Sequence, residues 1–167
     1  MNRYRQMPQH ATCLYRQTEI MKVDIETSVI IDKPRGKVAN FAANPSNAPR
    51  WYANIESVKW KTSQRLALGS RIAFVASFLG KRIEYTYEIV ELEPLERLVM
   101  RTAEGPFPME TTYTWKALSP KSTRMTLRNR GAPSGFAKFA GPMLSRSIRK
   151  ANEKDLASLK ELLESTK

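Results

Sequence analysis

Residues 23–52 decide the fold of this chain, and they read VDIETSVIIDKPRGKVANFAANPSNAPRWY. The first part predicts a β-strand, because apolar or β-branched side chains occupy every second position and mostly polar ones the positions between. A period of two places one set of side chains on one face, so this strand is expected to have one buried face. The buried set is Val23, Ile25, Thr27, Val29 and Ile31.

Two short helices are expected directly after this strand. Asp32 is a suitable N-cap for the first helix, Pro34 suits its first turn, and Asn44-Pro45 ends it. A second short helix fits Ser46 to Tyr52 and carries Trp51. The predicted order therefore opens with a strand followed by two short helices.

Six further strands follow, separated by breaks of only a few residues that contain Gly, Pro or Ser. Breaks this short imply antiparallel neighbours, because parallel strands need a crossover of about a dozen residues or more. The sequence therefore predicts an antiparallel meander, with strands at Ile55 to Thr62, Ser70 to Leu79, Arg82 to Leu92, Arg97 to Thr102, Met109 to Leu118 and Thr123 to Arg130.

The pattern changes to a helical period after Ser134. Apolar residues recur on one side as far as Leu163, which predicts a helix of about thirty residues and roughly 45 Å. Gly141-Pro142 predicts a kink near the start of this helix. Its apolar side consists of Phe136, Phe139, Ala140, Met143, Leu144, Ile148, Ala151, Leu156, Leu159 and Leu163.

Length and composition indicate one domain, since the chain has 167 residues of which 41% are hydrophobic. Residues 1–20 show neither period and are interpreted as a flexible extension before a domain at 21–167, with Met1 and Met21 both open as the native start. No apolar run approaches the roughly 20 residues of a membrane span. The first twenty residues also lack the apolar segment of a secretory signal, so we expect a cytoplasmic protein.

The formal net charge of +12 favours anionic partners, whereas solubility alone is the competing explanation. Glu84, Glu88 and Glu110 share the outward parity of their strands and are expected to pair with basic neighbours. Transient contact with an acidic membrane surface would use the outward basic residues. No specific nucleic-acid binding is expected, because no known recognition motif is present. The outward basic set is Arg97, Arg101, Arg124, Arg128, Arg130, Lys138, Arg146, Arg149 and Lys150.

This order of elements resembles the helix-grip fold of the START-like (SRPBCC) superfamily, which includes Bet v 1-like and polyketide cyclase/dehydrase proteins. The resemblance spans about residues 22–164. It implies an α+β fold in which a curved antiparallel sheet of about seven strands wraps a long C-terminal helix and leaves a cavity between them. The motifs that carry it are residues 29–41 (first strand into first helix), 44–51 (second helix with its tryptophan), 87–98 (centre of the sheet) and 144–163 (final helix).

Strand alternation predicts which residues line this cavity. The inward positions form an aromatic and methionine-rich wall with a few hydroxyls, which suits a flat or flexible apolar guest. Plain core packing is the competing explanation for each residue, and Trp51 is either a lid or an anchor for the second helix. The candidate ligand-binding residues are Trp51, Phe74, Phe78, Tyr85, Tyr87, Met100, Met109, Thr111, Tyr113, Phe136, Phe139 and Met143.

Few residues could carry out catalysis. His10 and Cys13 are the only histidine and cysteine, so no catalytic triad, no metal site and no cofactor is predicted. Tyr85, Tyr87 or Tyr113 could serve acid–base chemistry, but tyrosine is a weak catalyst without an activating partner.

The predicted function is binding or carrying a hydrophobic small molecule that is lipid-, polyketide- or quinone-like, by a monomer or homodimer. A polyketide cyclase or dehydratase acting in the same cavity is the alternative, and nucleic-acid binding through the basic surface is the less favoured one. Whether the protein is an enzyme stays open at this point, with the shortage of catalytic groups favouring a binding protein.

Overall fold

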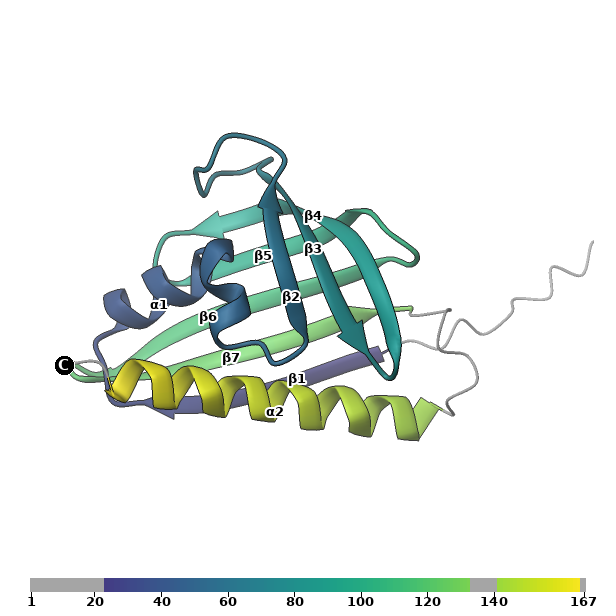
Figure 1. Ribbon diagram of the computed structural model, residues 1–167. Helices are drawn as coiled ribbons and strands as arrows, with labels where there is room; N and C mark the ends of the chain where they lie inside the picture. The colour runs from purple at the N-terminus through teal and green to yellow at the C-terminus, as the bar shows by residue number, and fades with distance from the viewer. Residues whose placement is uncertain (1–22, 133–140, 166–167) are drawn as a thin grey trace, which may run out of the picture.

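A computed structural model describes residues 23–132 and 141–165 (Figure 1). The predicted N-terminal extension, Phe136, Lys138 and Phe139 lie outside the described residues. The elements are β1 (Val23–Ile31), α1 (Arg35–Ala43), the 3-10 helix η1 (Pro45–Arg50), β2 (Ile55–Trp60), β3 (Arg71–Phe78), β4 (Lys81–Glu93), β5 (Arg97–Glu104), β6 (Met109–Ser119), β7 (Ser122–Gly131) and α2 (Gly141–Ser165).

The strands form one seven-stranded sheet in the order β1-β7-β6-β5-β4-β3-β2, and all neighbours are antiparallel. From β2 to β7 each strand pairs with the next in sequence, so the predicted meander is confirmed. Strand β1 then pairs with β7. In Figure 1 the sheet curves and α2 lies along β1. The α+β class and the helix-grip arrangement predicted from the sequence are therefore confirmed.

Helix α1 begins differently from the expectation. Pro34 occupies the N-cap position, its carbonyl accepts the amides of Lys37 and Val38, and no side chain caps the helix. The predicted Asp32 cap is wrong because Asp32 precedes the N-cap by two residues. Its amide instead donates to Glu164 Oε1 at 2.7 Å, which ties the end of β1 to the end of α2.

The second short helix is a 3-10 helix that ends one residue before Trp51. The Asn44 side chain caps it by accepting the amide of Ser46 at 3.1 Å. Pro49 lies inside this helix and lacks the amide proton that an α-helical turn would use, which is consistent with a short helix. Trp51 therefore lies at its C-cap, where the chain turns toward β2.

The inward parity predicted for the sheet is confirmed. Ile72, Leu98, Met125 and Leu127 are fully buried, and the main apolar cluster joins them to α1, η1 and the C-terminal half of α2. A second cluster contains Val23, Ile25, Leu144 and Ile148, and it joins β1 to the N-terminal half of α2. The long helix thus contacts two separate apolar clusters along its length.

The described part of α2 begins at Gly141, and the stretch of the predicted helix before it lies outside the described residues. The kink predicted at Gly141-Pro142 therefore stays a prediction. None of the helices in the two described ranges is long and apolar enough to cross a bilayer.

Side chains of α2 cover the free edge of β1. Arg149 Nη1 donates to the Glu26 carbonyl at 3.0 Å, and Lys160 Nζ donates to the Ile30 carbonyl at 2.8 Å. These carbonyls belong to an edge strand, where unpaired backbone groups invite pairing with another chain. Arg149 is exposed, as the predicted outward position requires, and its guanidinium also contributes to closing this edge.

Gly131→Ala is expected to lower the free energy of unfolding by about 1–2 kcal/mol. Gly131 pairs with Val23 and Met109, and an added Cβ would lie 2.5 Å from the Pro108 carbonyl oxygen and 2.4 Å from Met109 Sδ. The carbonyl belongs to the backbone, so the strand itself must shift.

Urea unfolding measures the loss of stability in Gly131→Ala, with Gly36→Ala as control. Gly36 lies in α1 with open space around it and should tolerate alanine without loss. Equal stability of both variants would contradict the close packing around Gly131.

Candidate functional site

A cavity of about 160 Å³ lies between the sheet and α2. Its walls come from α1, η1, strands β2 to β7 and one face of α2, so every layer of the fold contributes to it. A cavity of about 150 Å³ is known to accommodate benzene. The volume of this cavity therefore matches a single ring or a chain segment of similar size.

Most of the predicted site residues line this cavity, because strand alternation directs them toward α2. They come from β3, β4, β5 and β6 and form its apolar wall. These residues are Phe74, Phe78, Tyr85, Tyr87, Met100, Met109, Thr111 and Tyr113.

The other predicted residues do not line the cavity. Met143 is 57% exposed, because the face of α2 toward the cavity starts at Leu144 and continues through Ile148, so its assignment is wrong. Trp51 is only 2% exposed and is absent from the cavity wall, where its neighbour Tyr52 lies instead. This position fits the interpretation of Trp51 as an anchor. Phe136 and Phe139 lie outside the described residues.

Three stacked and edge-on rings form the aromatic wall on β3 and β4. The ring centroids of Phe74 and Tyr85 are 5.4 Å apart at 15°, and those of Tyr85 and Tyr87 are 4.9 Å apart at 59°. Rings held against one another in this way have few alternative rotamers, and they favour flat apolar guests. The wall is therefore a preformed surface for a ring.

A chain of hydrogen bonds crosses the floor of the cavity from β4 to α2. The Tyr87 hydroxyl lies 3.1 Å from Thr111 Oγ1, which donates to Asn129 Oδ1 at 2.8 Å. Asn129 Nδ2 then donates to Asn152 Oδ1 at 3.0 Å. Because Thr111 uses its only proton toward Asn129, Tyr87 is the donor to Thr111. The chain ends at Asn152 Nδ2, which is buried and has no partner among the described residues.

Asp155 places a carboxyl group in the cavity wall one helical turn beyond Asn152. It is 3% exposed, and its Oδ1 accepts the amide of Ala53 at 2.9 Å. Burial raises the pKa of Asp155 to about 6, against the lowering effects of the Ala53 amide and of the nearby Lys154 charge. A carboxyl with this pKa changes its protonation state near neutral pH.

The cavity tyrosines are held in their neutral form. The hydroxyls of Tyr52 and Tyr113 lie 2.7 Å apart, and burial raises the pKa of both above the usual value. Burial likewise raises the pKa of Tyr85, and that of Tyr87 to about 12. These groups act as hydrogen-bond donors and acceptors at ordinary pH. Asp155 is therefore better suited to acid–base chemistry near neutral pH than the cavity tyrosines are.

The polar residues of α2 were not predicted from the sequence as part of the site. Leu144, Ile148, Asn152, Asp155 and Leu159 follow one another at helical spacing on a single face. Two polar residues in an otherwise apolar stripe are a signal that could have identified them, because buried polar groups require partners. The apolar members of the stripe on their own indicate only core packing.

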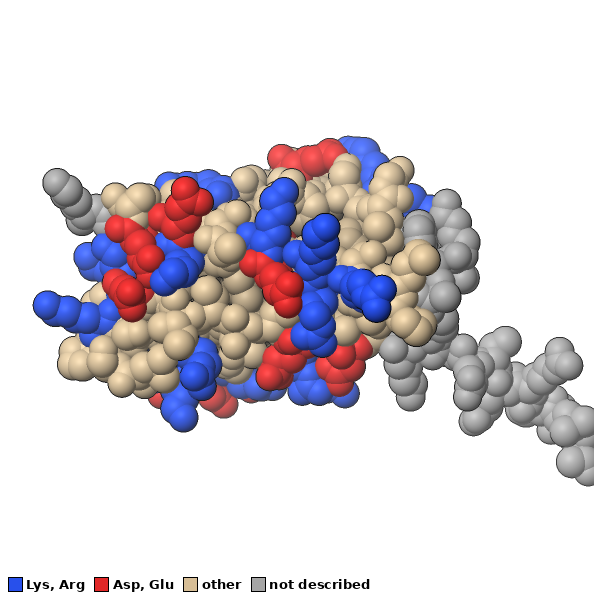
Figure 2. Space-filling view, turned by 90° about the horizontal axis from the view of Figure 1, so that it is seen from below, with Lys and Arg blue, Asp and Glu red and all other residues tan. Residues whose placement is uncertain are grey.

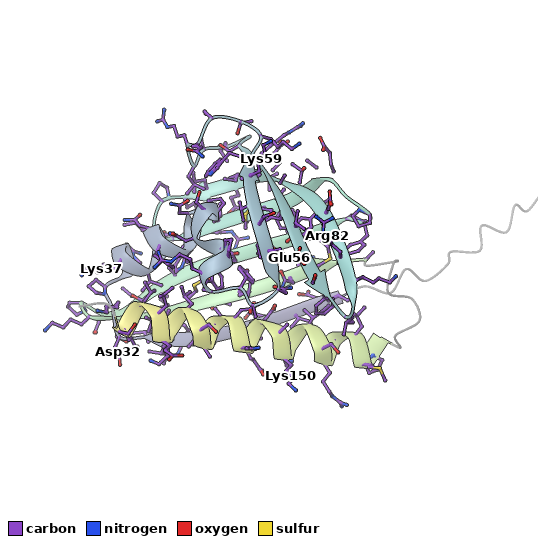
Figure 3. The ribbon with its side chains drawn as sticks, viewed as in Figure 1. Asp32, Lys37, Glu56, Lys59, Arg82 and Lys150 are labelled. Carbon is purple, nitrogen blue, oxygen red and sulfur yellow. The ribbon has the colours of Figure 1, made fainter. Side chains whose placement is uncertain are left out.

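Most charged residues lie on the exterior, where several of them form ion pairs. Arg71 Nε lies 2.8 Å from Glu88 and Arg101 Nε 2.7 Å from Glu110, which confirms the expected pairing of these glutamates. Figure 3 shows Arg82 directed toward Glu56, and Arg82 also pairs with Glu84. Asp24 binds two further members of the outward basic set, Arg128 and Arg130.

Basic and acidic side chains alternate over the face that Figure 2 shows, which is viewed from below Figure 1. Lys150 on α2 points away from the sheet (Figure 3). No lysine or arginine of the described ranges lines the cavity. No group of three or more His, Cys, Asp or Glu side chains in those ranges is arranged to hold a metal ion. The net positive charge therefore surrounds an uncharged or acidic interior.

The curved sheet, the long helix across it and the cavity between them define a helix-grip protein of the START-like superfamily, a fold that binds hydrophobic ligands. The family model described as polyketide cyclase / dehydrase and lipid transport matches residues 22–164, and the chain belongs to this family. A search among curated proteins found no matching sequence.

Solved structures share the fold at low sequence identity. The protein TTHA0849 from Thermus thermophilus has a TM-score of 0.71 and 19% identity, covering 85% of this chain and 97% of that one. The Zhui aromatase/cyclase from Streptomyces sp. R1128 has a TM-score of 0.70 and 16% identity, covering 86% and 94%. A START superfamily protein from Mycobacterium smegmatis has a TM-score of 0.71 and 14% identity, covering 86% and 99%.

Proposed function

We propose that this protein binds or carries a hydrophobic small molecule in the cavity between its sheet and α2. The observation that carries the proposal is the cavity itself, whose wall is mainly aromatic and aliphatic and includes no lysine or arginine of the described ranges. A lipid-, polyketide- or quinone-like molecule suits this wall, and the enclosed volume accommodates a ring-sized part of it. Contact with an acidic membrane surface and a cytoplasmic location stay predictions from the sequence.

The burial of aromatic surface supplies the driving force for such binding. Each Å² of apolar surface removed from water contributes about 25 cal/mol, so a single ring in a preformed cavity gains several kcal/mol before the entropic cost of association. The rings of Phe74, Tyr85 and Tyr87 already contact one another and need no reordering. A preformed wall of this kind lowers the cost of binding.

Ala76→Leu is expected to abolish binding of an apolar probe, because its side chain lines the cavity and the added atoms would occupy the space of the guest. Toluene is a suitable probe, and its saturable binding is measured from the rise in melting temperature and from amide chemical shifts. Ala73→Leu is the matched control, because Ala73 lies on the same strand with the opposite parity and is absent from the cavity wall. Equal binding by both variants would contradict the proposed site. Native mass spectrometry of freshly purified protein would in addition identify a retained ligand.

A second function, cyclase- or dehydratase-type chemistry in the same cavity, is favoured by Asp155 alone. General bases work best when their pKa lies near the operating pH, and this carboxyl meets that condition. A carboxylate here could remove a proton next to the carbonyl group of a bound ketone. Deuterium exchange at the carbon next to the carbonyl group of cyclohexanone, followed by NMR, should then be faster with the native protein than with Asp155→Asn. Equal rates would exclude this second function for Asp155.

A further inference from the structure

The polar residues of α2 and of the loop before β2 leave hydrogen-bonding capacity open at the cavity. Asn152 is 4% exposed and lines the cavity, and its Nδ2 has no partner in the described part of the chain. Asn54 also lines the cavity, and its Oδ1 is buried and likewise lacks a described partner. An unsatisfied buried polar group costs about 1–3 kcal/mol, so the two groups together favour a ligand that satisfies them.

Asn152 and Asn54 line the same cavity, and each is connected to Asp155 through the helix or the adjacent residue. Asp155 follows Asn152 by three residues on α2, which places both on the same face of the helix. Its Oδ1 accepts the amide of Ala53, the residue directly before Asn54. One end of the cavity thus presents a donor from Asn152, an acceptor from Asn54 and a carboxyl group from Asp155.

The orientation of the Asn152 amide follows from the chain of hydrogen bonds that reaches it. Its Oδ1 is occupied by Asn129 Nδ2 at 3.0 Å, so its Nδ2 is the free end. Hydrogen bonds in such a chain polarise one another, which strengthens the terminal donor. The group that completes the chain must therefore offer an acceptor to Asn152.

The groups around this end fit a neutral hydroxyl better than an ionised ligand group. A ligand carboxylate would face Asp155 and the Asn54 carbonyl oxygen, with no lysine or arginine of the described ranges in the cavity wall to balance it. An ammonium group would leave the Asn152 donor without an acceptor, since it can only donate. A hydroxyl both accepts and donates, so a single neutral group can serve Asn152 together with Asn54 or Asp155.

We propose that the buried end of the ligand is an uncharged, hydroxyl-bearing ring, such as a phenol or a cyclic alcohol. Its oxygen accepts a hydrogen bond from Asn152 Nδ2, and its O–H donates to Asn54 Oδ1 or to the Asp155 carboxylate. This inference rests on the proposed binding function and specifies the class of ligand. The ring fits the volume of about 160 Å³, and the aromatic wall of β3 and β4 contacts its apolar part.

A matched set of single-ring probes tests this inference by isothermal titration calorimetry with the full chain at pH 7.5. The probes are 4-methylphenol, toluene, 4-methylbenzoate and 4-methylbenzylamine, which share one ring and differ in the polar group. We expect 4-methylphenol to bind at least tenfold more tightly than toluene, and both charged probes to bind more weakly than 4-methylphenol. Toluene and 4-methylphenol binding equally, or either charged probe binding more tightly than 4-methylphenol, would overturn the inference and leave the proposed function standing.

Two variants test whether the preference for 4-methylphenol over toluene depends on Asn152 and Asn54. Asn152→Leu should remove the preference, so that 4-methylphenol binds no more tightly than toluene. Because Asn152 also accepts from Asn129, Asn54→Leu provides a second variant outside that chain, with a smaller loss of the same preference expected. An unchanged preference in both variants would contradict the inference. Failure of the native protein to bind either neutral probe would instead contradict the proposed function itself.

Discussion

Replacement of Trp51 by alanine is expected to lower the free energy of unfolding by about 3–5 kcal/mol. The side chain is 2% exposed, and its ring centroid lies 3.9 Å from that of Tyr52 and 6.0 Å from that of Tyr113. Removing the indole leaves a large void where η1 meets the sheet, and the surrounding residues can fill it only in part. Since native domains are stable by about 5–15 kcal/mol, this loss is a large share of the total.

Urea unfolding of the native chain and of Trp51→Ala measures this loss. Trp60→Ala is the matched control, because Trp60 lies half-buried on the edge strand β2 with its Nε1 bonded to Ser46 Oγ, and a smaller loss is expected. A lid would behave differently. If Trp51 only closed the cavity, the variant would keep its stability and release toluene faster, and that result would contradict its role as an anchor.

The consequence for the site is indirect. Trp51 packs against Tyr52 and Tyr113, and the hydroxyls of these two tyrosines meet at 2.7 Å in the cavity wall. Fixing the two rings from behind keeps both hydroxyls in place. Trp51, which the sequence leaves open as a lid or an anchor, therefore supports the cavity from outside its wall.

The strands could be predicted from the sequence because their two faces differ in polarity. The alternation in β1 separates buried Val23, Ile25 and Ile31 from exposed Asp24 and Glu26, and the structure repeats this pattern residue by residue. Short turns between strands leave an antiparallel meander as the simplest topology, and this is the order observed. The same alternation placed the residues of β3 to β6 in the cavity wall.

The polar end of the cavity could not be predicted in the same way. Whether Asn152 and Asp155 lie in a core, in a cavity or at the surface depends on how α2 crosses the sheet, and periodicity along one helix does not contain that angle. Met143 shows the same limit, since a rotation of about 100° per residue separates it from buried Leu144. The Asp32 cap failed for a local reason, because a residue of suitable type lies too early in the chain to cap the helix that forms.

Asp155→Asn is expected to make the ligand-free protein more stable by about 2–3 kcal/mol at pH 8. Burial raises the pKa of Asp155 to about 6 from the ordinary value of 3.8, and each pH unit of such a difference corresponds to about 1.4 kcal/mol. Between these two values the folded state retains a proton that the unfolded state releases, so stability falls as the pH rises through this window. Above pH 6 the full loss of stability caused by the ionised Asp155 carboxylate is present. Below pH 4 both states hold the proton, and the cost disappears.

Asparagine keeps an oxygen for the Ala53 amide and carries no charge, so the advantage of the variant should shrink toward zero at pH 4. The groups that surround Asp155 do not reverse this sign, because Tyr52 and Tyr113 stay neutral and Lys154 only moderates the rise in pKa. Urea unfolding of both proteins at pH 4, 6 and 8 gives the difference directly. Asp24→Asn is a control for which the opposite change in stability is expected. The hydrogen bond from Arg128 lowers the pKa of Asp24, so replacing Asp24 should slightly reduce stability at pH 8.

A stabilising effect of Asp155→Asn at pH 8 would mean that the native chain bears a destabilising carboxyl group in its cavity. Residues that reduce stability are concentrated where binding or catalysis needs them, which would strengthen the case for a polar ligand end at Asp155. Equal stability of the two proteins at pH 8 would show that this carboxylate is solvated or balanced in the folded state. The carboxyl would then have an ordinary pKa, and its acid–base role would be lost.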